Sequence, residues 1–185
     1  MSRIGKKPVS IPEKVKAVIE NGVIRVEGPL GKLSMGIPEG ILVNSDGKTI
    51  NVSVAKGAVN KDALFGTVRA RIQNMVSGVV KEFEKVLEIT GVGFKGEVKG
   101  KQISLQLGFS HPVIVDIPEG IKMSFDPKQT TLTIKGIDRE AVGNIAAQIR
   151  RIKKTEPYKG TGIKYQGEHI IRKAGKTAAA GGAKK

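Results

Sequence analysis

Short runs in which apolar and polar residues alternate predict antiparallel β-strands in the first half of the chain. Glycine, proline, asparagine and aspartate separate these runs, as they do at the turns of a sheet. The two clearest turns are Gly28-Pro29-Leu30-Gly31 and Asp46-Gly47. The strands predicted in this way are Gly22 to Glu27, Lys32 to Ile37, Ile41 to Asn44 and Thr49 to Val54.

The spacing of apolar residues then changes to three and four, which predicts an α-helix with one apolar face. This helix is expected to begin near Asn60, whose side chain can cap the first turn. A second helix is expected to begin near Asp138. The expected buried stripes are Leu64, Val68, Ile72, Met75, Val79 and Phe83 in the first helix, and Val142, Ile145, Ala146, Ile149 and Ile152 in the second.

An internal repeat organises these elements. The pentapeptide Ile37-Pro38-Glu39-Gly40-Ile41 recurs as Ile117-Pro118-Glu119-Gly120-Ile121, and the same offset pairs Gly28 with Gly108. The repeat predicts an α+β fold of two tandem similar domains, each an antiparallel β-sheet packed against one α-helix. Val86 to Thr90 is expected to be the first strand of the second domain. The predicted bounds are 1–82 for the first domain, 83–173 for the second and 174–185 for a disordered basic tail.

The charge of the chain points to a polyanionic partner. The 32 Lys and Arg residues outnumber the 17 Asp and Glu residues, which gives a net charge of +15. Residues 150–185, the basic segment, contain eleven basic and two acidic residues. Like charges gathered in this way repel one another unless phosphates lie opposite, so the segment is expected to bind nucleic acid. No run is long and apolar enough for a membrane span, so no membrane partner is expected.

Within the basic segment, residues 156–168 combine lysine and glycine with Tyr158 and Tyr165, which are the 2 tyrosines of the chain. Glycine lets backbone N–H groups approach phosphates, lysine neutralises them, and an exposed tyrosine ring can stack on an unpaired base. Alternatively, this stretch is a Gly-rich turn whose tyrosines pack on the second domain. The candidate contacts are Lys153, Lys154, Tyr158, Lys159, Gly160, Gly162, Lys164, Tyr165, His169, Arg172, Lys173 and Lys176, with Arg3, Lys6 and Lys7 of the N-terminal arm.

Signals for catalysis are weak. Gly91-Val92-Gly93-Phe94-Lys95-Gly96 matches the G-x-G-x-x-G fingerprint, which would make the protein a nucleotide-binding enzyme. That fingerprint requires a helix next, and the following residues alternate as a strand does. His111 and His169 have no second His or Cys at metal-ligand spacing, so neither a metal nor a cofactor is expected. A nonspecific DNA-binding protein remains the other alternative, although no helix-turn-helix or finger pattern is present.

Several motifs, in order along the chain, resemble the bacterial large-subunit ribosomal protein six family. They are the opening Met1-Ser2-Arg3-Ile4-Gly5-Lys6-Lys7-Pro8, Thr90-Gly91-Val92-Gly93-Phe94, Leu107-Gly108-Phe109-Ser110-His111-Pro112, Pro157-Tyr158-Lys159-Gly160 and the stretch from Gly167-Glu168 to Arg172-Lys173. The resemblance covers essentially the whole chain. It implies a fold of two similar α+β domains and a structural protein that is not an enzyme.

The resemblance also implies partners and a location. The family binds large-subunit rRNA near the base of the lateral stalk, where translational GTPases dock, so the implied setting is the ribosome in the cytoplasm. Neighbouring ribosomal proteins and, transiently, elongation factors are the implied protein partners, and no homo-oligomer is expected. The family's RNA-facing motif corresponds to Tyr158, Lys159, Gly160, Lys164 and Tyr165, and its basic continuation to Arg172, Lys173 and Lys176. Thr161 stands where the family usually has lysine.

Overall fold

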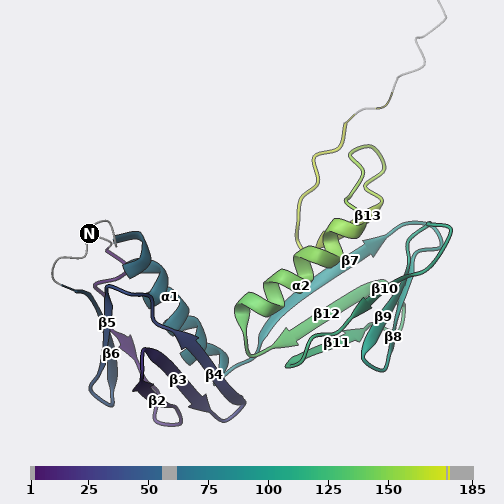
Figure 1. The fold of residues 1–185 in the computed structure, drawn as a ribbon. Helices are drawn as coiled ribbons and strands as arrows, with labels where there is room; N and C mark the ends of the chain where they lie inside the picture. The colour runs from purple at the N-terminus through teal and green to yellow at the C-terminus, as the bar shows by residue number, and fades with distance from the viewer. Residues whose placement is uncertain (1–2, 56–61, 174, 176–185) are drawn as a thin grey trace, which may run out of the picture. The chain divides into compact units, whose positions relative to one another are not determined.

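The chain forms two compact units. The computed structural model describes residues 3–55, 62–173 and 175. The first unit comprises Met1–Phe83 with Gly136–Val142, and the second comprises Glu84–Lys135 with Gly143–Lys185. Figure 1 shows the elements of both units. The domain bounds expected from the sequence, 1–82, 83–173 and 174–185, stay a prediction.

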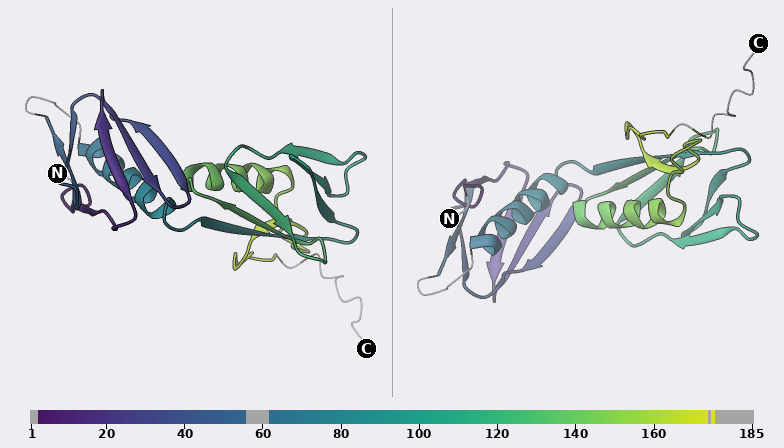
Figure 2. Two further views of the ribbon diagram at one scale, coloured as in Figure 1. Left: turned by 90° about the horizontal axis from the view of Figure 1, so that it is seen from below. Right: turned by 90° about the horizontal axis from the view of Figure 1, so that it is seen from above.

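In the first unit, antiparallel strands form two three-stranded sheets, and helix α1 contacts both. One sheet has the order β1-β6-β5 and the other the order β2-β3-β4. Figure 2 shows α1 lying along these strands. The bounds are β1 Val9–Ser10, β2 Lys16–Glu20, β3 Val23–Gly28, β4 Gly31–Gly36, β5 Ile41–Ser45, β6 Thr49–Val54 and α1 Asp62–Gly78. Strands β3 to β6 match the predicted runs to within about two residues, whereas β1 and β2 were not predicted.

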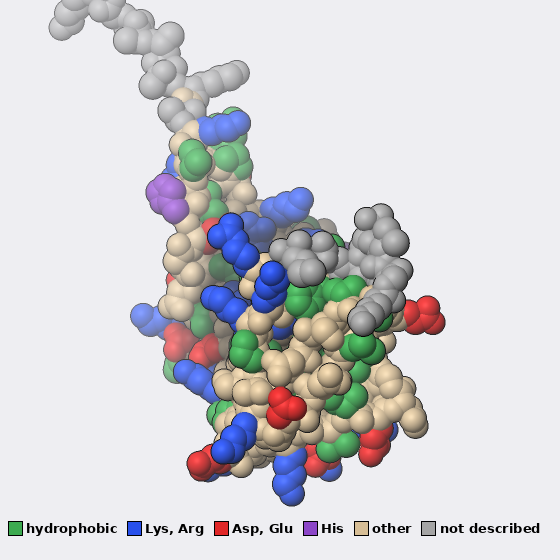
Figure 3. All heavy atoms as spheres, turned by 90° about the vertical axis from the view of Figure 1, so that its left-hand side faces the viewer, with side chains coloured by type: hydrophobic (Ala, Val, Ile, Leu, Met, Phe, Trp, Pro, Cys, Tyr) green, Lys and Arg blue, Asp and Glu red, His purple; other side chains and the backbone are tan. Residues whose placement is uncertain are grey.

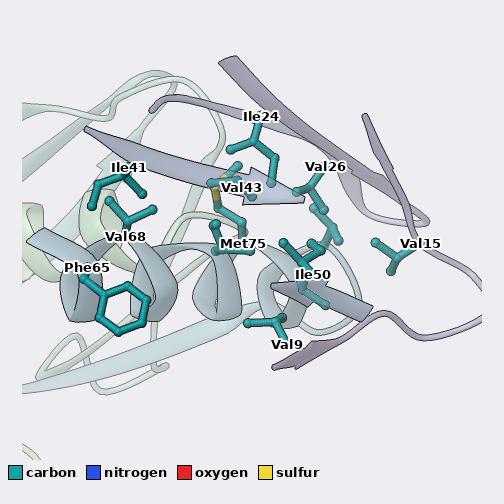
Figure 4. Packing of buried hydrophobic residues seen from close by; sticks show 13 residues of the cluster. Val9, Val15, Ile24, Val26, Ile41, Val43, Ile50, Phe65, Val68 and Met75 are labelled. Atoms are coloured by element: carbon teal, nitrogen blue, oxygen red, sulfur yellow. The ribbon is translucent and has the colours of Figure 1, made fainter. Parts of the chain in front are cut away.

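Alternation of side chains across the strands builds the core of this unit. Ile24 and Val26 of β3 are fully buried while Arg25 between them is exposed, which is the period of two that a half-buried strand requires. Val68 and Ile72 of α1 close the core from the helix side. Figure 4 shows Ile24, Val26 and Val68 among the buried side chains that lie between the helix and the strands. Burial of this apolar surface is the main favourable term for the fold.

The predicted stripe of the first helix needs two corrections. Leu64 is 36% exposed and Phe65 is buried in its place, because the buried positions follow 65, 68, 72, 76 and 79. Phe83 is not helical, since α1 ends at Gly78 and Phe83 begins strand β7. The expected start at Asn60 lies outside the described residues.

The second unit repeats this arrangement and adds a strand. Its sheets have the orders β10-β9-β8 and β11-β12-β7-β13. The predicted strand 86–90 lies within β7, and helix α2 begins next to Asp138, whose Oδ1 accepts a hydrogen bond from the Glu140 N–H at 2.8 Å. The bounds are β7 Phe83–Thr90, β8 Lys95–Lys99, β9 Gln102–Gln106, β10 Val113–Asp116, β11 Ile121–Phe125, β12 Thr131–Gly136, α2 Arg139–Ile152 and β13 Gly162–Tyr165.

The repeated pentapeptide forms the same turn in both units, which confirms the duplication. The Ile41 N–H donates to the Pro38 carbonyl at 3.2 Å, and the Ile121 N–H donates to the Pro118 carbonyl at 3.3 Å. The glycines of the two turns, Gly40 and Gly120, have φ angles of 83° and 78°. Residues with a side chain rarely adopt this left-handed backbone conformation, so both copies need glycine there. The tandem α+β fold class is thus confirmed, with the strands of each unit divided between two sheets.

One face of the described chain carries side chains of mixed character (Figure 3). Lys and Arg side chains and carboxylates both occur on the face drawn in Figure 3, with hydrophobic side chains between them. No helix in the described part of the chain is long and apolar enough to cross a membrane.

Candidate nucleic-acid interface

Strand β13 fixes the middle of the basic segment to the second unit. It pairs antiparallel with β7, with Gly162 opposite Thr90 and Tyr165 opposite Leu87. Ile163 is fully buried, and its N–H donates to the Lys153 carbonyl at 2.9 Å. Residues 153–161 therefore form the loop that connects the end of helix α2 to strand β13. The sequence predicted an irregular glycine-rich stretch here, and its strand was missed.

Hydrogen bonds within this loop set its shape. The Glu156 N–H donates to the Thr161 carbonyl at 2.8 Å, and the Gly160 N–H donates to the Glu156 carbonyl at 2.9 Å. The Thr161 hydroxyl donates to Glu156 Oε2 at 3.1 Å. Tyr158 and Lys159 lie in the turn that these bonds close, and both are exposed. Two consecutive residues of this hydrogen-bonded loop thus expose an aromatic ring and an ammonium group to solvent.

The last described part of the basic segment returns beside this loop. The Lys173 N–H donates to the Pro157 carbonyl at 2.9 Å. A Cβ atom placed on Gly160 would lie 3.3 Å from Nη2 of Arg172, so the Arg172 guanidinium packs on that glycine. Between the two stretches lies an open groove of about 570 Å³, lined by Thr90, Gly160, Lys164, His169 and Arg172 among others. Gly160 has a φ of 73°, which favours glycine.

Glu168 holds the basic segment together. Its carboxylate accepts hydrogen bonds from Arg150 Nε at 3.1 Å, from Arg150 Nη2 and from the Tyr165 N–H at 3.0 Å. The Arg150 hydrogen bonds, followed by the Tyr165 N–H, hold the pKa of the Glu168 carboxyl below its ordinary value. The same pair raises the pKa of Arg150. The sequence contained both residues, but their structural role was not predicted.

The two tyrosines of the basic segment, Tyr158 in the loop and Tyr165 at the end of β13, have different surroundings. Tyr158 is 53% exposed, as stacking on an unpaired base would require. The Tyr165 ring is half-buried between cations, with the Arg150 guanidinium 5.5 Å and Lys85 Nζ 5.8 Å from the ring centroid. The two alternatives considered from the sequence therefore describe one tyrosine each: Tyr158 faces solvent, and Tyr165 packs on the unit.

The candidate basic residues divide into paired and unpaired groups. Lys164 lies opposite Glu88 across the β13–β7 pair and forms an ion pair with it at 2.9 Å. Lys153 Nζ lies 4.6 Å from the centroid of the Phe109 ring. Within the described residues no carboxylate lies at ion-pair distance from the exposed cations of the segment, which are Arg151, Lys154, Lys159, Arg172 and Lys173. His169 is exposed as well, and Lys176 lies outside the described residues.

The predicted N-terminal contacts belong to the first unit. Arg3, Lys6 and Lys7 are exposed. Arg69 of α1 holds this arm through its backbone, because its Nε donates to the Lys7 carbonyl at 3.0 Å and its Nη2 donates to the Pro8 carbonyl at 3.0 Å. The Lys6 and Lys7 ammonium groups are thus displayed on an anchored backbone.

The glycine run at 91–96 leads into strand β8, so a helix does not follow it. Gly93 has a φ of 74°, and a Cβ on Gly96 would lie 2.2 Å from Cζ of Phe125. These glycines serve a tight turn and close packing, as the alternating pattern predicted. In the described part of the chain, no group of three or more His, Asp or Glu side chains is placed to hold a metal ion.

Comparison with known proteins gives a consistent result over nearly the whole chain. The sequence model of the family described as "Ribosomal protein L6" matches residues 11–82 and again 90–166. Three relatives have the name "Large ribosomal subunit protein uL6". The one from Anaeromyxobacter sp. (strain Fw109-5) is 49% identical over 97% of this chain and 100% of its own length. The relative from Syntrophomonas wolfei is 50% identical over 95% of this chain and 98% of its own length. The relative from Synechococcus sp. (strain RCC307) is 48% identical over 96% of this chain and 98% of its own length.

Proposed function

Because the chain belongs to the ribosomal protein L6 family, we propose that it binds large-subunit rRNA through the basic segment of its second unit. Membership of this family makes the chain a structural component of the large ribosomal subunit in the cytoplasm, and not an enzyme. The reading of Gly91 to Gly96 as a nucleotide site of an enzyme is accordingly set aside.

One observation carries the proposal: within the described part of the segment, two cations form ion pairs that fix its shape, and five others are exposed. Arg150 pairs with Glu168 and Lys164 pairs with Glu88, which fixes the strand and the return of the chain. Lys159 directly precedes Gly160 and Arg172 packs against it, and neither cation has a carboxylate partner among the described residues. A fixed array of unpaired cations favours phosphates, since binding releases their condensed counterions.

The chemistry around these cations favours folded RNA. Tyr158 offers an exposed ring to an unpaired base. Gly160 is itself buried, and its lack of a side chain lets the Arg172 guanidinium pack against the loop. Lys153, Lys154, Tyr165, His169 and Lys173 complete the proposed contact surface, with Lys176 beyond the described residues and Arg3, Lys6 and Lys7 as contacts of the first unit. Gly162, which is buried, contributes by shaping the backbone at the start of β13. RNA loops and ends present such bases, whereas the regular groove of a DNA duplex does not.

The resemblance noted in the sequence extends the proposal to a location. We place the contact near the base of the lateral stalk, where the chain would adjoin other ribosomal proteins and lie transiently close to elongation factors. The protein would act there as a single copy. Chemical footprinting of large subunits assembled with and without the protein tests this location directly, because only the contacted rRNA nucleotides should change their reactivity.

The binding mechanism is tested by the salt dependence of affinity. The full chain is titrated with large-subunit rRNA at several salt concentrations, and the slope of log K against log salt is measured. Each neutralised phosphate contributes about 0.7 to 0.9 to the slope. Replacing Lys159 and Arg172 together by alanine should lower the slope by roughly 1.5. Lys128→Ala, which removes an exposed lysine of the same unit outside the segment, is the matched control and should leave the slope unchanged.

Two results would contradict the proposal. A wild-type slope near zero would rule out phosphate neutralisation as the source of affinity. Equal affinity for duplex DNA and rRNA at matched salt would instead favour the nonspecific DNA-binding alternative.

A further inference from the structure

Two loops of the second unit that the proposed contact surface does not include lie directly beside it. The first, residues 91–94, connects β7 to β8, and the second, residues 107–112, connects β9 to β10. The first loop follows Thr90, which is the cross-strand partner of Gly162 at the start of β13. The second meets the basic segment where Lys153 Nζ lies 4.6 Å from the centroid of the Phe109 ring.

Phe94 joins the two loops to each other. A Cβ atom on Gly91 would lie 2.6 Å from Cδ2 of Phe94, and one on Gly108 would lie 3.0 Å from Cε1 of the same ring. The half-buried Phe94 ring therefore occupies space that only glycines leave open at both positions. Loops 91–94 and 107–112 and the loop of the basic segment, residues 153–161, thus form one cluster of loops.

The outer surface of this cluster has an unusual composition for exposed loops. Val92 is fully exposed, and Phe109 is 43% exposed although it is a large apolar side chain. Ser110 and His111 are exposed next to it. Residues 90–94 and 107–112 contain neither aspartate nor glutamate, so the cation above the Phe109 ring is not offset by a carboxylate from these loops.

We propose that Phe109 is a stacking platform for an unpaired rRNA base, with Lys153 positioned to neutralise the adjacent phosphate. An aromatic ring with an ammonium group on its face binds a base by stacking and the sugar-phosphate chain by charge. The absence of acidic residues from both loops and their continuity with the basic segment favour RNA over a protein surface as the occupant. This inference rests on the proposed function and extends its contact surface to residues outside the basic segment.

The experiment uses the fact that the chain contains no tryptophan. Phe109→Trp introduces a single indole at the proposed platform, and Ile114→Trp introduces one at a 60% exposed position on β10 as the matched control. On addition of large-subunit rRNA, the indole at position 109 should be quenched as a base stacks on it, and the indole at position 114 should not. Unchanged fluorescence at 109 while the RNA is bound would overturn the proposal.

A second measurement separates stacking from charge. Phe109→Ala should weaken rRNA binding about fivefold or more while the salt slope stays that of the wild type, because stacking releases no counterions. Phe109→Tyr should restore the affinity. If Phe109→Ala binds rRNA with the affinity and the salt slope of the wild type, the stacking role of Phe109 is refuted while the proposed function stands. A wild type without salt-dependent rRNA binding would instead refute the proposed function itself.

Discussion

Replacing Glu168 by glutamine tests whether this carboxylate organises the basic segment. The substitution keeps the size of the side chain and removes the charge that binds Arg150. Hydrogen bonds to charged groups contribute about 1.5 to 3 kcal/mol. The side chains of Arg150 and Glu168 are 32% and 25% exposed, so the pair is intermediate between an exposed and a buried ion pair. An exposed pair contributes about 0 to 1 kcal/mol, and disruption of a buried pair costs about 3 to 5 kcal/mol. We therefore expect a local loss of about 2 kcal/mol.

Amide hydrogen exchange of Tyr165 measures this loss where it occurs, because its N–H donates to Glu168 Oε2. A loss of about 2 kcal/mol corresponds to roughly 30-fold faster exchange through local opening. Glu119→Gln, at an exposed glutamate of the same unit, is the matched control and should leave the rate unchanged. If Tyr165 exchanges at the same rate in the wild type and in Glu168→Gln at pH 7, the carboxylate does not hold this part of the chain.

The pH dependence of the same signal has a defined sign. The pKa of Glu168 is lowered in the folded chain, first by the Arg150 hydrogen bond, so folding favours its ionised form. Its contribution is complete above the ordinary carboxyl pKa of about 4.3 and is lost as the pH falls through the lower folded value. The ratio of Tyr165 exchange rates between Glu168→Gln and the wild type should therefore be constant from pH 7 to about 5 and approach one in stronger acid. A ratio that instead grew in acid would reverse this reasoning.

Two further substitutions test the loop itself. Gly162→Ala places a side chain at a φ of 136°, with its Cβ 2.7 Å from the Lys154 carbonyl oxygen, so local unfolding of β13 should become easier by roughly 2 kcal/mol. Hydrogen exchange of the Ile163 amide measures this loss, and an unchanged exchange rate would contradict the prediction. Thr161→Lys replaces the hydroxyl that binds Glu156 by an ammonium group. This substitution should raise the salt slope of rRNA binding by at most about 0.9, and it should not raise the slope if the new lysine pairs with Glu156. A larger increase would show that position 161 faces more than one phosphate.

The repeat and the strand alternation allowed much of the fold to be predicted, and particular residues show where the pattern failed. Strand β2 was missed because Val18 is 45% exposed between Ala17 and Ile19, which face inward, so the apolar run shows no alternation. Strand β1 has only two residues, too few for any period. Strand β13 begins with glycine and follows a loop rich in it, a composition typical of turns.

The clustering of charge predicts the candidate site, which stays a proposal, but the ion pairs inside the segment could not be predicted from it. Lys164 meets Glu88 only because β13 pairs with β7 in one register, and these residues lie far apart in the sequence. Arg150 and Glu168 meet because the chain turns back after β13. Charge counts treat all lysines and arginines alike, whereas tertiary structure decides which of them are neutralised within the protein and which remain for a ligand.

Comparison of the two copies shows what distinguishes the second unit, which carries the basic segment. Strands β1-β6-β5 of the first unit correspond to β7-β12-β11 of the second, and Val9 and Ile89 occupy equivalent buried positions. In the second unit β13 adds a fourth strand beyond β7, and both ends of that strand lead into cationic loops. The added strand is compatible with a stable fold, because the Ile163 side chain is fully buried and the backbone of β13 pairs with the edge strand β7. The second copy of the repeat thus differs from the first by a strand that carries the proposed RNA-binding segment.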